Sequence, residues 1–399
     1  MQCVILAAGE GTRMRPLTTS RPKVMLPLAG KPMLEHLVKN VRDANITDII
    51  LVVGYHEEAI RTWFGNGSKF GVSIRYVVQR KQMGTADALR TTEPFIHEKF
   101  LMLNGDMIIE TSDLRKIIGQ SGPLMATYTT THPESFGVVT VENKKIITLE
   151  EKSLHPKSDI INAGAYLFEI GIFTILKKIS PSSRGEYELT DALTDYISEK
   201  QLTAYPLSTW MDVGYPWDML SANEHLLESI SGDLAGTIEE NVVIKGQLIL
   251  GKGSVIKSGT YIEGPCIIGE NTTVGPNAYL RPGTTVGNNC HIGHAVEIKN
   301  SIIFDDTKIP HYNYIGDSVI GSKCNFGAGT KIANLRHDHG IVKVGGISTG
   351  RKKFGAVIGD DVLFGINCSI NTGSSIGSGT RIAPHTLVSG VVENDTVVN

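Results

Sequence analysis

A repeat of six residues runs through the second half of the chain and restricts its possible folds more than any other feature. A hexapeptide repeat predicts a β-solenoid, in which each hexad supplies a short strand and a turn. Its aliphatic residue points inward, and three hexads close one triangular coil. The uninterrupted series is Ile238, Ile244, Leu250, Ile256, Ile262, Ile268, Val274, Leu280, Val286, Ile292, Ile298 and Phe304. The phase breaks near Pro310 and resumes at Ile358, Phe364, Ile370, Ile376, Ile382 and Val388.

The first half of the chain follows a different pattern, in which short apolar runs alternate with helical spacing. Apolar runs lie at residues 4–8, 49–53, 74–78 and 100–103, and Arg75 is the only charged residue within them. Such runs are typical of strands that are buried on both faces. Between the first two, residues 33–44 carry apolar side chains at helical spacing. This order predicts a mostly parallel α/β sheet with right-handed crossover helices.

Length and composition divide the chain and exclude some classes of protein. The 399 residues predict two or three domains, and the helical stretch 216–230 is followed by Ser-Gly-Asp. We therefore expect domains at residues 1–230 and 236–399. With 38 basic and 41 acidic residues the net charge is -3, which argues against a protein that binds nucleic acid or an anionic membrane.

Cysteine usage and the N-terminus predict a cytoplasmic protein. The five cysteines are odd in number and none is in a CxxC pair, so we expect reduced, mostly buried thiols. Met1 leads directly into an apolar stretch without a basic region or a cleavage site. No apolar run approaches the roughly 18 residues that span a membrane.

The first apolar run leads into a glycine-rich loop, Leu-Ala-Ala-Gly-Glu-Gly-Thr-Arg, at residues 6–13. Closely spaced glycines let backbone N–H groups approach phosphate oxygens, and Arg13 adds positive charge. The loop has neither the spacing of a P-loop nor the third glycine of a dinucleotide-binding motif. A tight turn explains the glycine pair equally well. The continuation at residues 21–33, Arg-Pro-Lys-Val-Met-Leu-Pro-Leu-Ala-Gly-Lys-Pro-Met, makes the pattern more specific.

These two segments together resemble the motif of sugar-1-phosphate nucleotidylyltransferases, and the loop length resembles the thymidylyltransferase branch. With the solenoid included, nearly the whole chain resembles the bifunctional N-acetylglucosamine-1-phosphate uridylyltransferase/glucosamine-1-phosphate N-acetyltransferase family, particularly its archaeal forms. The resemblance implies an α/β Rossmann-like nucleotidyltransferase domain followed by a left-handed parallel β-helix of hexapeptide repeats.

The resemblance implies specific roles for residues of the first half. The nucleotide's base and ribose would contact Leu6, Ala7, Ala8 and Gly9, and its phosphates Gly11, Thr12 and Arg13. Base recognition would involve Gln79, Gly84 and Thr85. The sugar phosphate would contact Gly137, Glu151, Lys152 and Asn162, with Glu150 as an alternative to Glu151. Arg13 and Lys23 would be catalytic cations, because the reaction brings several phosphates together.

Two aspartates complete this first site as metal ligands. Asp106 follows the apolar run 100–103, and Asp212 lies in the sequence Trp-Met-Asp-Val-Gly. The resemblance makes both carboxylates ligands of Mg²⁺, at the strand ends where open α/β sheets bind ligands. Two hard carboxylates and several waters suit Mg²⁺ better than zinc. Each residue taken alone also has a purely structural interpretation: Asp106 could be a turn residue, and Lys23 could be a solvated surface charge.

The resemblance also implies an acetyltransferase site in the solenoid, where the hexads are interrupted. His311 would be the general base, because the ordinary pKa of histidine lies near neutrality. The amino-sugar phosphate would contact Arg281, Lys299, Tyr314 and Asn325, and acetyl-CoA would contact Ala328 and Asn334. The chain departs from the bacterial pattern in an extended segment at residues 335–358, whose basic residues would meet coenzyme A phosphates or form an ordinary charged surface. It also departs from that pattern at Ile366 and Pro384, which makes acetyl-CoA harder to place than the amino sugar.

The expected function is synthesis of UDP-N-acetylglucosamine in two reactions. Glucosamine 1-phosphate would be acetylated by acetyl-CoA, and N-acetylglucosamine 1-phosphate would then react with UTP to release pyrophosphate. By analogy we expect a homotrimer. The sequence leaves open UTP or dTTP, glucose 1-phosphate or N-acetylglucosamine 1-phosphate, and acetylation of galactosamine 1-phosphate.

Two other functions remain open at this stage. One is a monofunctional sugar-1-phosphate nucleotidylyltransferase with a structural or regulatory β-helix. The other is a non-catalytic regulatory subunit, which retention of Arg13, Lys23, Asp106 and Asp212 disfavours.

Overall fold

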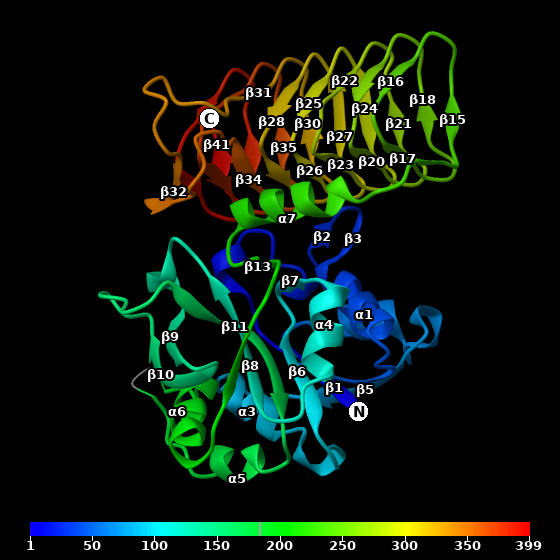
Figure 1. The fold of residues 1–399 in the computed structure, drawn as a ribbon. Coiled ribbons are helices and arrows are strands. Elements are labelled where there is room, and N and C mark those ends of the chain that lie inside the picture. The colour runs from blue at the N-terminus through cyan, green and yellow to red at the C-terminus, as the bar shows by residue number, and fades with distance from the viewer. Residues whose placement is uncertain (183–184) are drawn as a thin grey trace. The chain divides into compact units, whose positions relative to one another are not determined.

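The computed structural model describes residues 1–182 and 185–399, which form two compact units (Figure 1). The first unit contains residues 1–10, 22–25 and 33–212, and the second contains residues 11–21, 26–32 and 213–399. The domain boundaries expected from the sequence, 1–230 and 236–399, remain a prediction.

The first unit is built on a nine-stranded sheet. Its strands in spatial order are β5 (Ser73–Val78), β4 (Asp48–Val53), β1 (Gln2–Ala7), β6 (Phe100–Asn104), β11 (Ile160–Phe168), β8 (Leu124–Thr129), β12 (Thr203–Pro206), β10 (Lys145–Glu151) and β9 (Gly137–Glu142). A separate two-stranded sheet pairs β7 (Met107–Ile109) with β13 (Trp210–Asp212).

Helices cover this sheet, and both of its faces are buried. The helices of the first unit are η2 (Lys23–Met25), α1 (Met33–Asp43), α2 (Glu57–Phe64), η3 (Ser68–Phe70), α3 (Thr85–Arg90), η4 (Glu93–Phe95), α4 (Thr111–Ile118), η5 (Pro133–Ser135), α5 (Ile172–Leu176) and α6 (Leu189–Glu199). In β1, Cys3 and Ile5 pack into one apolar cluster, whereas Val4 packs into another. Burial on both faces explains why the strand is a continuous apolar run.

The sheet is less parallel than expected. Strands β5, β4, β1 and β6 are mutually parallel, but β11 is antiparallel to both β6 and β8. Strands β9 and β10 form a hairpin whose two connecting residues, Asn143 and Lys144, both have positive φ. A two-residue turn of this kind joins antiparallel strands. The expectation of a mostly parallel sheet is therefore wrong beyond β6.

The second unit contains the solenoid, whose strands form three parallel sheets. The first sheet contains β14 (Asp233–Leu234), β17 (Leu248–Leu250), β20 (Cys266–Ile268), β23 (Thr284–Val286), β26 (Ile302–Ile303), β29 (Val319–Ile320), β34 (Ala356–Ile358), β37 (Ser374–Ile376) and β40 (Val391–Val392). The second contains β15 (Thr237–Ile238), β18 (Val255–Ile256), β21 (Thr273–Val274), β24 (His291–His294), β27 (Lys308–His311), β30 (Asn325–Phe326), β35 (Leu363–Phe364), β38 (Arg381–Ile382) and β41 (Val397–Val398). The third contains β16 (Val243–Lys245), β19 (Tyr261–Glu263), β22 (Tyr279–Leu280), β25 (Glu297–Lys299), β28 (Tyr314–Gly316), β31 (Lys331–Ile332), β36 (Ser369–Ile370) and β39 (Leu387–Val388).

The repeat shortens earlier than the sequence analysis placed its break. Val286 pairs with Ile303, which is buried in the solenoid core, so Ile303 rather than Phe304 is the inward residue. A second residue is missing before the next strand of this sheet, because Ile303 pairs with Ile320. Both shortenings fall between the third and the first sheet, not near Pro310.

One expected inward residue lies at the surface. Ile238 is 37% exposed, because it belongs to the first strand of the second sheet and no earlier coil covers it. Other hexad residues, such as Ile256, Ile262 and Ile268, are fully buried. The predicted fold class, an α/β Rossmann-like nucleotidyltransferase domain followed by a left-handed parallel β-helix, is confirmed.

The second unit also includes segments outside the repeat. They are η1 (Thr12–Met14), the hairpin of β2 (Pro27–Leu28) and β3 (Lys31–Pro32), α7 (Pro216–Glu228) and the hairpin of β32 (Lys343–Val344) and β33 (Ile347–Ser348). Helix α7 lies along the solenoid (Figure 1) and packs on β29. Among the described residues, no helix has the length and apolar character needed to cross a bilayer.

All five cysteines are buried and form no disulfide. Burial raises the pKa of the Cys266, Cys290 and Cys324 thiols to about 12. The expectation of mostly buried thiols is thus confirmed, and their reduced state stays a prediction.

Candidate functional sites

The carboxyl ends of the parallel strands approach one another closely in the first unit. The N–H of Gly105 donates to the carbonyl of Leu6 at 2.9 Å, and a Cβ at Gly105 would lie 2.6 Å from that oxygen. A Cβ at Gly54 would lie 3.0 Å from the carbonyl oxygen of Ala8 and 3.2 Å from that of Gln79. Glycine at these two positions therefore allows the ends of β1, β4, β5 and β6 to form one compact edge.

The other residues expected to bind the nucleotide in this unit lie near the same edge. Ala7 is buried, whereas nothing lies within 4 Å of a Cβ placed on Gly9. Gly84, with φ of 100°, precedes α3, and Thr85 accepts a hydrogen bond from the N–H of Leu189 at 3.1 Å.

The lysine expected to be catalytic and both expected metal ligands come together in the first unit. Lys23 is buried, and its Nζ lies 2.6 Å from Oδ2 of Asp106. Asp212 is paired with Met107 across the antiparallel strands β13 and β7, so it lies beside Asp106. In the described part of the chain, no three His, Cys, Asp or Glu residues form a metal-binding cluster. A pair of carboxylates fits Mg²⁺, which usually takes one or two protein carboxylates together with waters and substrate phosphates.

Gly11, Thr12 and Arg13 belong to the second unit. Gly11 has φ of 69° and precedes η1. The Arg13 guanidinium lies 5.0 Å from the ring centroid of Tyr215, which precedes α7. This cation–π contact holds Arg13 through the face of its guanidinium and leaves N–H groups at its edge for phosphate oxygens.

Strand register brings the expected sugar-phosphate residues together. Gly137 pairs with Glu151, and a Cβ on Gly137 would lie 3.1 Å from Oε2 of Glu151 and 3.6 Å from Cβ of Asn162. Asn162 accepts a hydrogen bond from the Tyr166 hydroxyl at 2.8 Å. Burial, opposed by that hydrogen bond, raises the pKa of Tyr166. The tyrosine was not found from the sequence, because only the fold places it beside Asn162.

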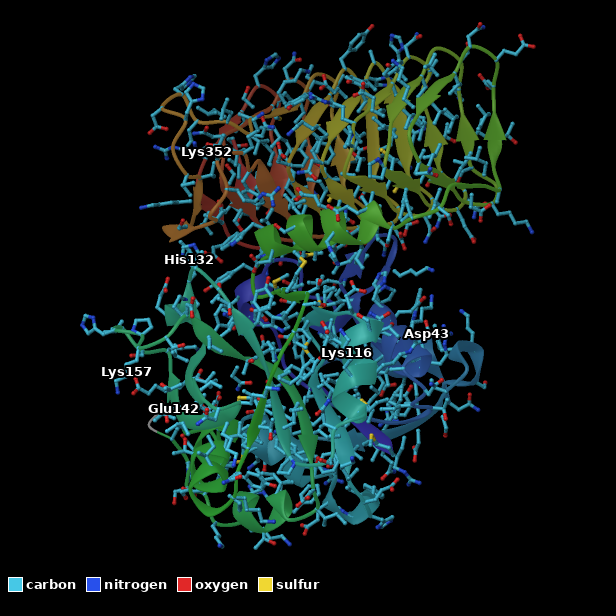
Figure 2. All side chains as sticks on the ribbon, in the orientation of Figure 1. Asp43, Lys116, His132, Glu142, Lys157 and Lys352 are labelled. Atoms are coloured by element: carbon cyan, nitrogen blue, oxygen red, sulfur yellow. The ribbon has the colours of Figure 1, made fainter. Side chains whose placement is uncertain are left out.

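The same register separates the two alternative glutamates. Glu150 accepts an ion-pair hydrogen bond from Lys157 at 2.7 Å, which lowers the pKa of Glu150. Lys157 lies on an exposed loop (Figure 2). Since neighbouring residues of a strand point to opposite faces, Glu151 and not Glu150 faces Asn162. Lys152 adjoins this group, with Nζ 4.0 Å from Oε1 of Glu151.

In the second unit, a cavity of about 470 Å³ lies between α7 and the solenoid corner that joins the third sheet to the first. Two of the expected amino-sugar phosphate ligands, Arg281 and Lys299, contribute to its wall. The cavity is lined by Glu224, Glu228, Pro265, Arg281, Pro282, Gly283, Lys299 and Asn300. It therefore combines two cations with two carboxylates from α7.

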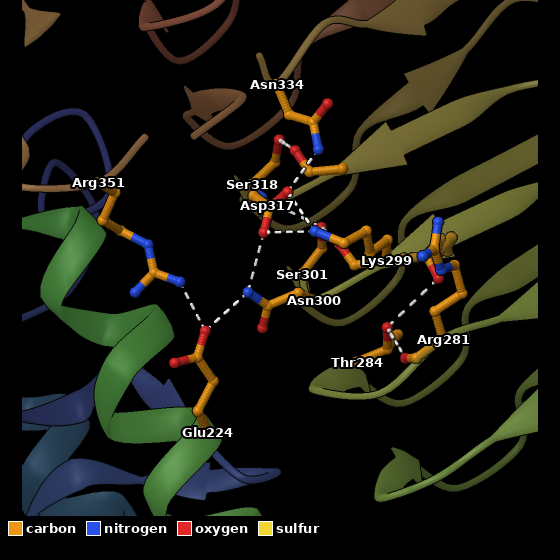
Figure 3. Close-up of polar contacts among 12 residues, drawn as sticks. Glu224, Arg281, Thr284, Lys299, Asn300, Ser301, Asp317, Ser318, Asn334 and Arg351 are labelled. Atoms are coloured by element: carbon orange, nitrogen blue, oxygen red, sulfur yellow. Dashed lines mark hydrogen bonds and ion pairs between the residues drawn. The ribbon is translucent and has the colours of Figure 1, made fainter. Parts of the chain in front are cut away.

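Asp317 is the centre of a polar network at this corner (Figure 3). Its side chain is 3% exposed and lies 2.8 Å from Nζ of Lys299. It also accepts hydrogen bonds from Nδ2 of Asn300 and of Asn334. Glu224 of α7 extends the network, because it accepts a hydrogen bond from Asn300 at 2.7 Å. Two expected substrate ligands, Lys299 and Asn334, thus share one buried carboxylate.

Arg281 and Tyr314 lie on the two coils that flank the coil of Lys299: Arg281 directly follows β22, and Tyr314 begins β28. Nη1 of Arg281 donates to Oε1 of Glu297 at 3.0 Å, and Nε of Arg281 is buried without a partner among the described residues. Burial, followed by the charges of Glu297 and Asp317, raises the pKa of Tyr314. The hydroxyl of Tyr314 therefore stays protonated well above neutral pH and remains a hydrogen-bond donor.

His311 is exposed at the end of β27, one coil beyond His294, with which it pairs. The ring centroids of His294 and Tyr312 lie 5.2 Å apart in an edge-to-face contact. Burial, followed by the charge of Lys257, lowers the pKa of His291.

Asn325 and Ala328 are separate from the Lys299 group. Asn325 lies on the second sheet and pairs with Lys308, whereas Lys299 and Tyr314 lie on the third sheet. Ala328 accepts a backbone hydrogen bond from Asn367. Within residues 1–182 and 185–399, no hydrogen bond joins Asn325 or Ala328 to the Lys299 network.

The extended segment 335–358 is fixed to α7 through Arg351. Its guanidinium donates to Ser221 Oγ at 2.7 Å and to Glu224 Oε1 at 2.6 Å. Lys352 and Lys353 are exposed, and Lys352 is visible on this segment in Figure 2. Arg351 is therefore a structural contact, whereas Lys352 and Lys353, like the exposed Lys343 of the same segment, keep the character of a charged surface.

Sequence reasoning missed Asp317, Asn300 and Glu224. The signal for Asn300 and Asp317 was the repeat length, because each stands where a coil loses one residue. Glu224 left no such signal, since its role depends on where α7 packs.

The folds and polar groups described above define a nucleotidyltransferase joined to a hexapeptide-repeat transferase. Family models agree: one described as Nucleotidyl transferase matches residues 2–229, one described as GMPPB C-terminal domain matches residues 262–362, and one described as Bacterial transferase hexapeptide (six repeats) matches residues 355–390.

Known proteins resemble the chain over its whole length. The bifunctional protein GlmU of Methanocaldococcus jannaschii is 43% identical over 100% of this chain and 97% of its own. GlmU of Methanococcus maripaludis strain C7 is 47% identical at the same coverage. A bifunctional sugar-1-phosphate nucleotidylyltransferase/acetyltransferase of Sulfurisphaera tokodaii is 38% identical over 97% of both chains.

A solved structure from Bacillus anthracis, described as a glucose-1-phosphate thymidylyltransferase in complex with sucrose, has a TM-score of 0.54 and 34% identity. It covers 58% of this chain and 97% of its own. The chain belongs to the family of bifunctional sugar-1-phosphate nucleotidylyltransferase/acetyltransferases, as its motifs predicted.

Proposed function

We propose that the chain catalyses two consecutive reactions that produce UDP-N-acetylglucosamine. The solenoid transfers an acetyl group from acetyl-CoA to glucosamine 1-phosphate. The α/β half then joins N-acetylglucosamine 1-phosphate to UTP and releases pyrophosphate. The observation that carries the acetyltransferase half is the cavity of about 470 Å³ lined by Arg281 and Lys299, since a spacer needs no such cations.

In nucleotidylyl transfer, a phosphate oxygen of the sugar attacks the α-phosphorus in line and pyrophosphate leaves. No covalent intermediate is needed, so catalysis consists of positioning and charge neutralisation. Lys23 would lie between the nucleotide and sugar phosphates, and Arg13 would contact the nucleotide's phosphates. Asp106 and Asp212 would hold Mg²⁺, which when bound neutralises charge on the triphosphate and on the leaving pyrophosphate.

The remaining first-half residues orient the two substrates. Leu6, Ala7, Ala8 and Gly9 would contact the base and ribose, Gly11 and Thr12 the phosphates, and Gln79, Gly84 and Thr85 the base edge. The sugar phosphate would contact Gly137, Glu151, Lys152 and Asn162. The proximity of Gly137, Glu151 and Asn162 across three strands supports this assignment.

In acetyl transfer, the 2-amino group attacks the thioester carbonyl of acetyl-CoA. His311 would take a proton from that amine as general base. Arg281, Lys299 and Tyr314 would bind the phosphate, which would join the ion pairs that both cations already make with Glu297 and Asp317. The carbonyl carbon becomes a tetrahedral intermediate, and one well-placed donor to its oxyanion is worth about 3 kcal/mol. Its collapse breaks the C–S bond, so that coenzyme A leaves as the thiol and the amide remains on the sugar.

The acetyl-CoA site supports a homotrimer. Asn325 lies on the second sheet and Lys299 on the third, so both contact one substrate if the second sheet of one subunit faces the third sheet of its partner. Ala328 and Asn334 would then contact acetyl-CoA between subunits. Sugar phosphates, nucleoside triphosphates and acetyl-CoA are the partners we propose, and the cytoplasm is the location. UTP is the nucleotide named in this proposal, and dTTP and glucose 1-phosphate are further substrates to assay.

Thiol release from acetyl-CoA, with and without glucosamine 1-phosphate, tests the second activity. Release that requires the amino sugar and disappears in His311→Ala is expected, with pyrophosphate release from UTP unchanged. His337→Ala, an exposed histidine of the extended segment, is the matched control. No thiol release, in a protein that still forms pyrophosphate, would leave a monofunctional nucleotidylyltransferase with a structural β-helix. Loss of neither activity in His311→Ala would remove this histidine from the mechanism.

A further inference from the structure

Gln79 is a buried side chain at the edge where we propose that the nucleotide base binds. It directly follows β5 and is 5% exposed. The backbone N–H of Gln79 donates to the carbonyl oxygen of Val53 at 2.8 Å, which fixes the Gln79 backbone to the end of β4. Gly54, with almost no free space between Ala8 and Gln79, keeps this backbone beside the Leu6–Gly9 loop.

Both N–H groups of the Gln79 amide are already used. Nε2 donates to Oδ2 of Asp87 at 2.9 Å and to the carbonyl oxygen of Gly84 at 3.1 Å. An ionised carboxylate and a backbone carbonyl are both acceptors only. The terminal group that faces them must therefore be the NH₂, and the amide cannot rotate by 180° without opposing oxygen to oxygen.

The remaining polar atom is Oε1, which is an acceptor. Among the described residues, no donor is bonded to it. Oε1 therefore favours a base that places a hydrogen-bond donor against it. Uracil and thymine carry a hydrogen on N3, whereas N3 of cytosine carries a lone pair.

The two acceptors that orient Gln79 are themselves held. Oδ1 of Asp87 lies 3.1 Å from the Arg90 guanidinium, so each carboxylate oxygen has its own partner. Arg90 lies 4.7 Å from the ring centroid of Tyr187. A Cβ on Gly84 would lie 2.4 Å from the carbonyl oxygen of Tyr187, so only glycine fits and the Gly84 carbonyl stays in place.

We propose that Asp87 is a specificity-determining positioning residue, which orients the Gln79 amide so that Oε1 accepts the N3–H of uracil or thymine and disfavours cytosine. This inference rests on the proposed role of Gln79 in base recognition. Asp87 need not touch the base, because it acts through the direction of one amide. Uracil is favoured because its N3–H donates a hydrogen bond to Oε1 of Gln79. Cytosine is disfavoured because the lone pair on its N3 would face the same oxygen.

The test measures kcat/KM for UTP and CTP in pyrophosphate release at saturating N-acetylglucosamine 1-phosphate. Asp87→Asn is nearly isosteric and offers a donor as well as an acceptor, so it removes one of the two groups that oppose the reversed Gln79 amide and leaves only the Gly84 carbonyl to oppose it. We expect the UTP/CTP ratio to fall about tenfold, the size of one hydrogen bond's contribution, mainly through KM for UTP. Asp87→Ala should lower the ratio similarly. Glu57→Gln, which breaks the comparable Glu57–Arg61 pair on α2, should leave the ratio unchanged.

A chemical probe tests the same atom without a mutation that affects folding. UTP methylated at N3 lacks the donor, and the wild-type enzyme should use it at least tenfold less efficiently than UTP. Equal use of the methylated nucleotide, or an unchanged UTP/CTP ratio in both Asp87 variants, would overturn the inference.

The Gln79→Ala variant distinguishes failure of the proposed role of Gln79 from failure of the inference about Asp87. If its UTP/CTP ratio equals that of wild type, Gln79 does not read the base and the proposed role of Gln79 fails. If the ratio falls in Gln79→Ala but not in the Asp87 variants, only the inference about Asp87 fails.

Discussion

The two units assemble their polar sites by different routes. In the α/β unit, Lys23, Asp106 and Asp212 come from three distant parts of the chain and meet through strand order. In the solenoid, Lys299, Asp317 and Asn334 lie on consecutive coils and are stacked by the repeat itself. The first route depends on the whole topology, whereas the second depends on one corner of neighbouring coils.

This difference changes where function leaves a trace in the sequence. A solenoid buries the same position in every coil, so a departure from the repeat stands out in its sequence. The coils at Asn300 and Asp317 are one residue short, and the next corner holds the extended segment. The α/β unit has no repeat to depart from, and its site shows only as separate motifs.

The largest expected effect separates the two activities. Asp106→Asn removes one of two carboxylates at the proposed Mg²⁺ site and leaves Lys23 without its charged partner. Pyrophosphate release should fall on the order of 100-fold or more, while thiol release from acetyl-CoA stays within twofold of wild type. Asp43→Asn, an exposed aspartate of α1, is the control. Parallel loss of both activities would contradict the independence of the two sites.

A core truncation in each unit should separate their modes of stability. Ile298→Ala and Leu103→Ala each remove a fully buried side chain and should lower the free energy of unfolding by about 2–5 kcal/mol. In the solenoid the loss of amide protection should remain within the neighbouring coils, because each coil contacts only its neighbours. In the Leu103→Ala variant the loss of amide protection should spread across the first unit. Hydrogen exchange measures the loss in both variants. An equally wide loss in the two variants would contradict the expected difference between the units.

Asp317→Asn tests the corner network with a nearly isosteric change. The buried charge that orients Lys299 and Asn334 is lost, so KM for glucosamine 1-phosphate should rise about tenfold. Nucleotidylyl transfer should not change. Asp306→Asn, an exposed aspartate of the same solenoid, should leave KM as it is. A wild-type KM in Asp317→Asn would make the network purely structural.

The smallest expected effect concerns the extended segment. Arg351→Met removes the contacts to Ser221 and Glu224, and because Glu224 is partly exposed the loss of stability should be at most about 1 kcal/mol. Without Arg351, Glu224 is held less firmly at the cavity, so KM for glucosamine 1-phosphate should rise two- to threefold. Such a rise corresponds to a loss of binding free energy on the order of half a kcal/mol. Thermal unfolding and acetyl transfer measure these changes. Lys352→Met should change neither the stability nor KM for glucosamine 1-phosphate. A raised KM for acetyl-CoA in Lys352→Met would instead assign this lysine to the coenzyme.

Much of the fold was predictable, because both halves use patterns that local physics determines. Apolar runs predicted β1, β4, β5 and β6, and the six-residue period predicted the solenoid. The mixed half of the sheet was not predictable from the apolar runs, since antiparallel pairing depends on short connections such as Asn143-Lys144. Ile303 replaced Phe304 as the inward residue because a shortened turn advances the register by one.

The sequence by itself determined the class of each unit, the family and the candidate residues, since apolar periodicity and short motifs are properties of the local chain. Only the tertiary structure decided which neighbours those residues have. It placed Glu151 rather than Glu150 beside Asn162, and it gave Lys299 and Asn334 a common partner in Asp317. The orientation of a side chain depends on groups that other strands and coils bring within hydrogen-bond distance, and those contacts exist only once the chain has folded.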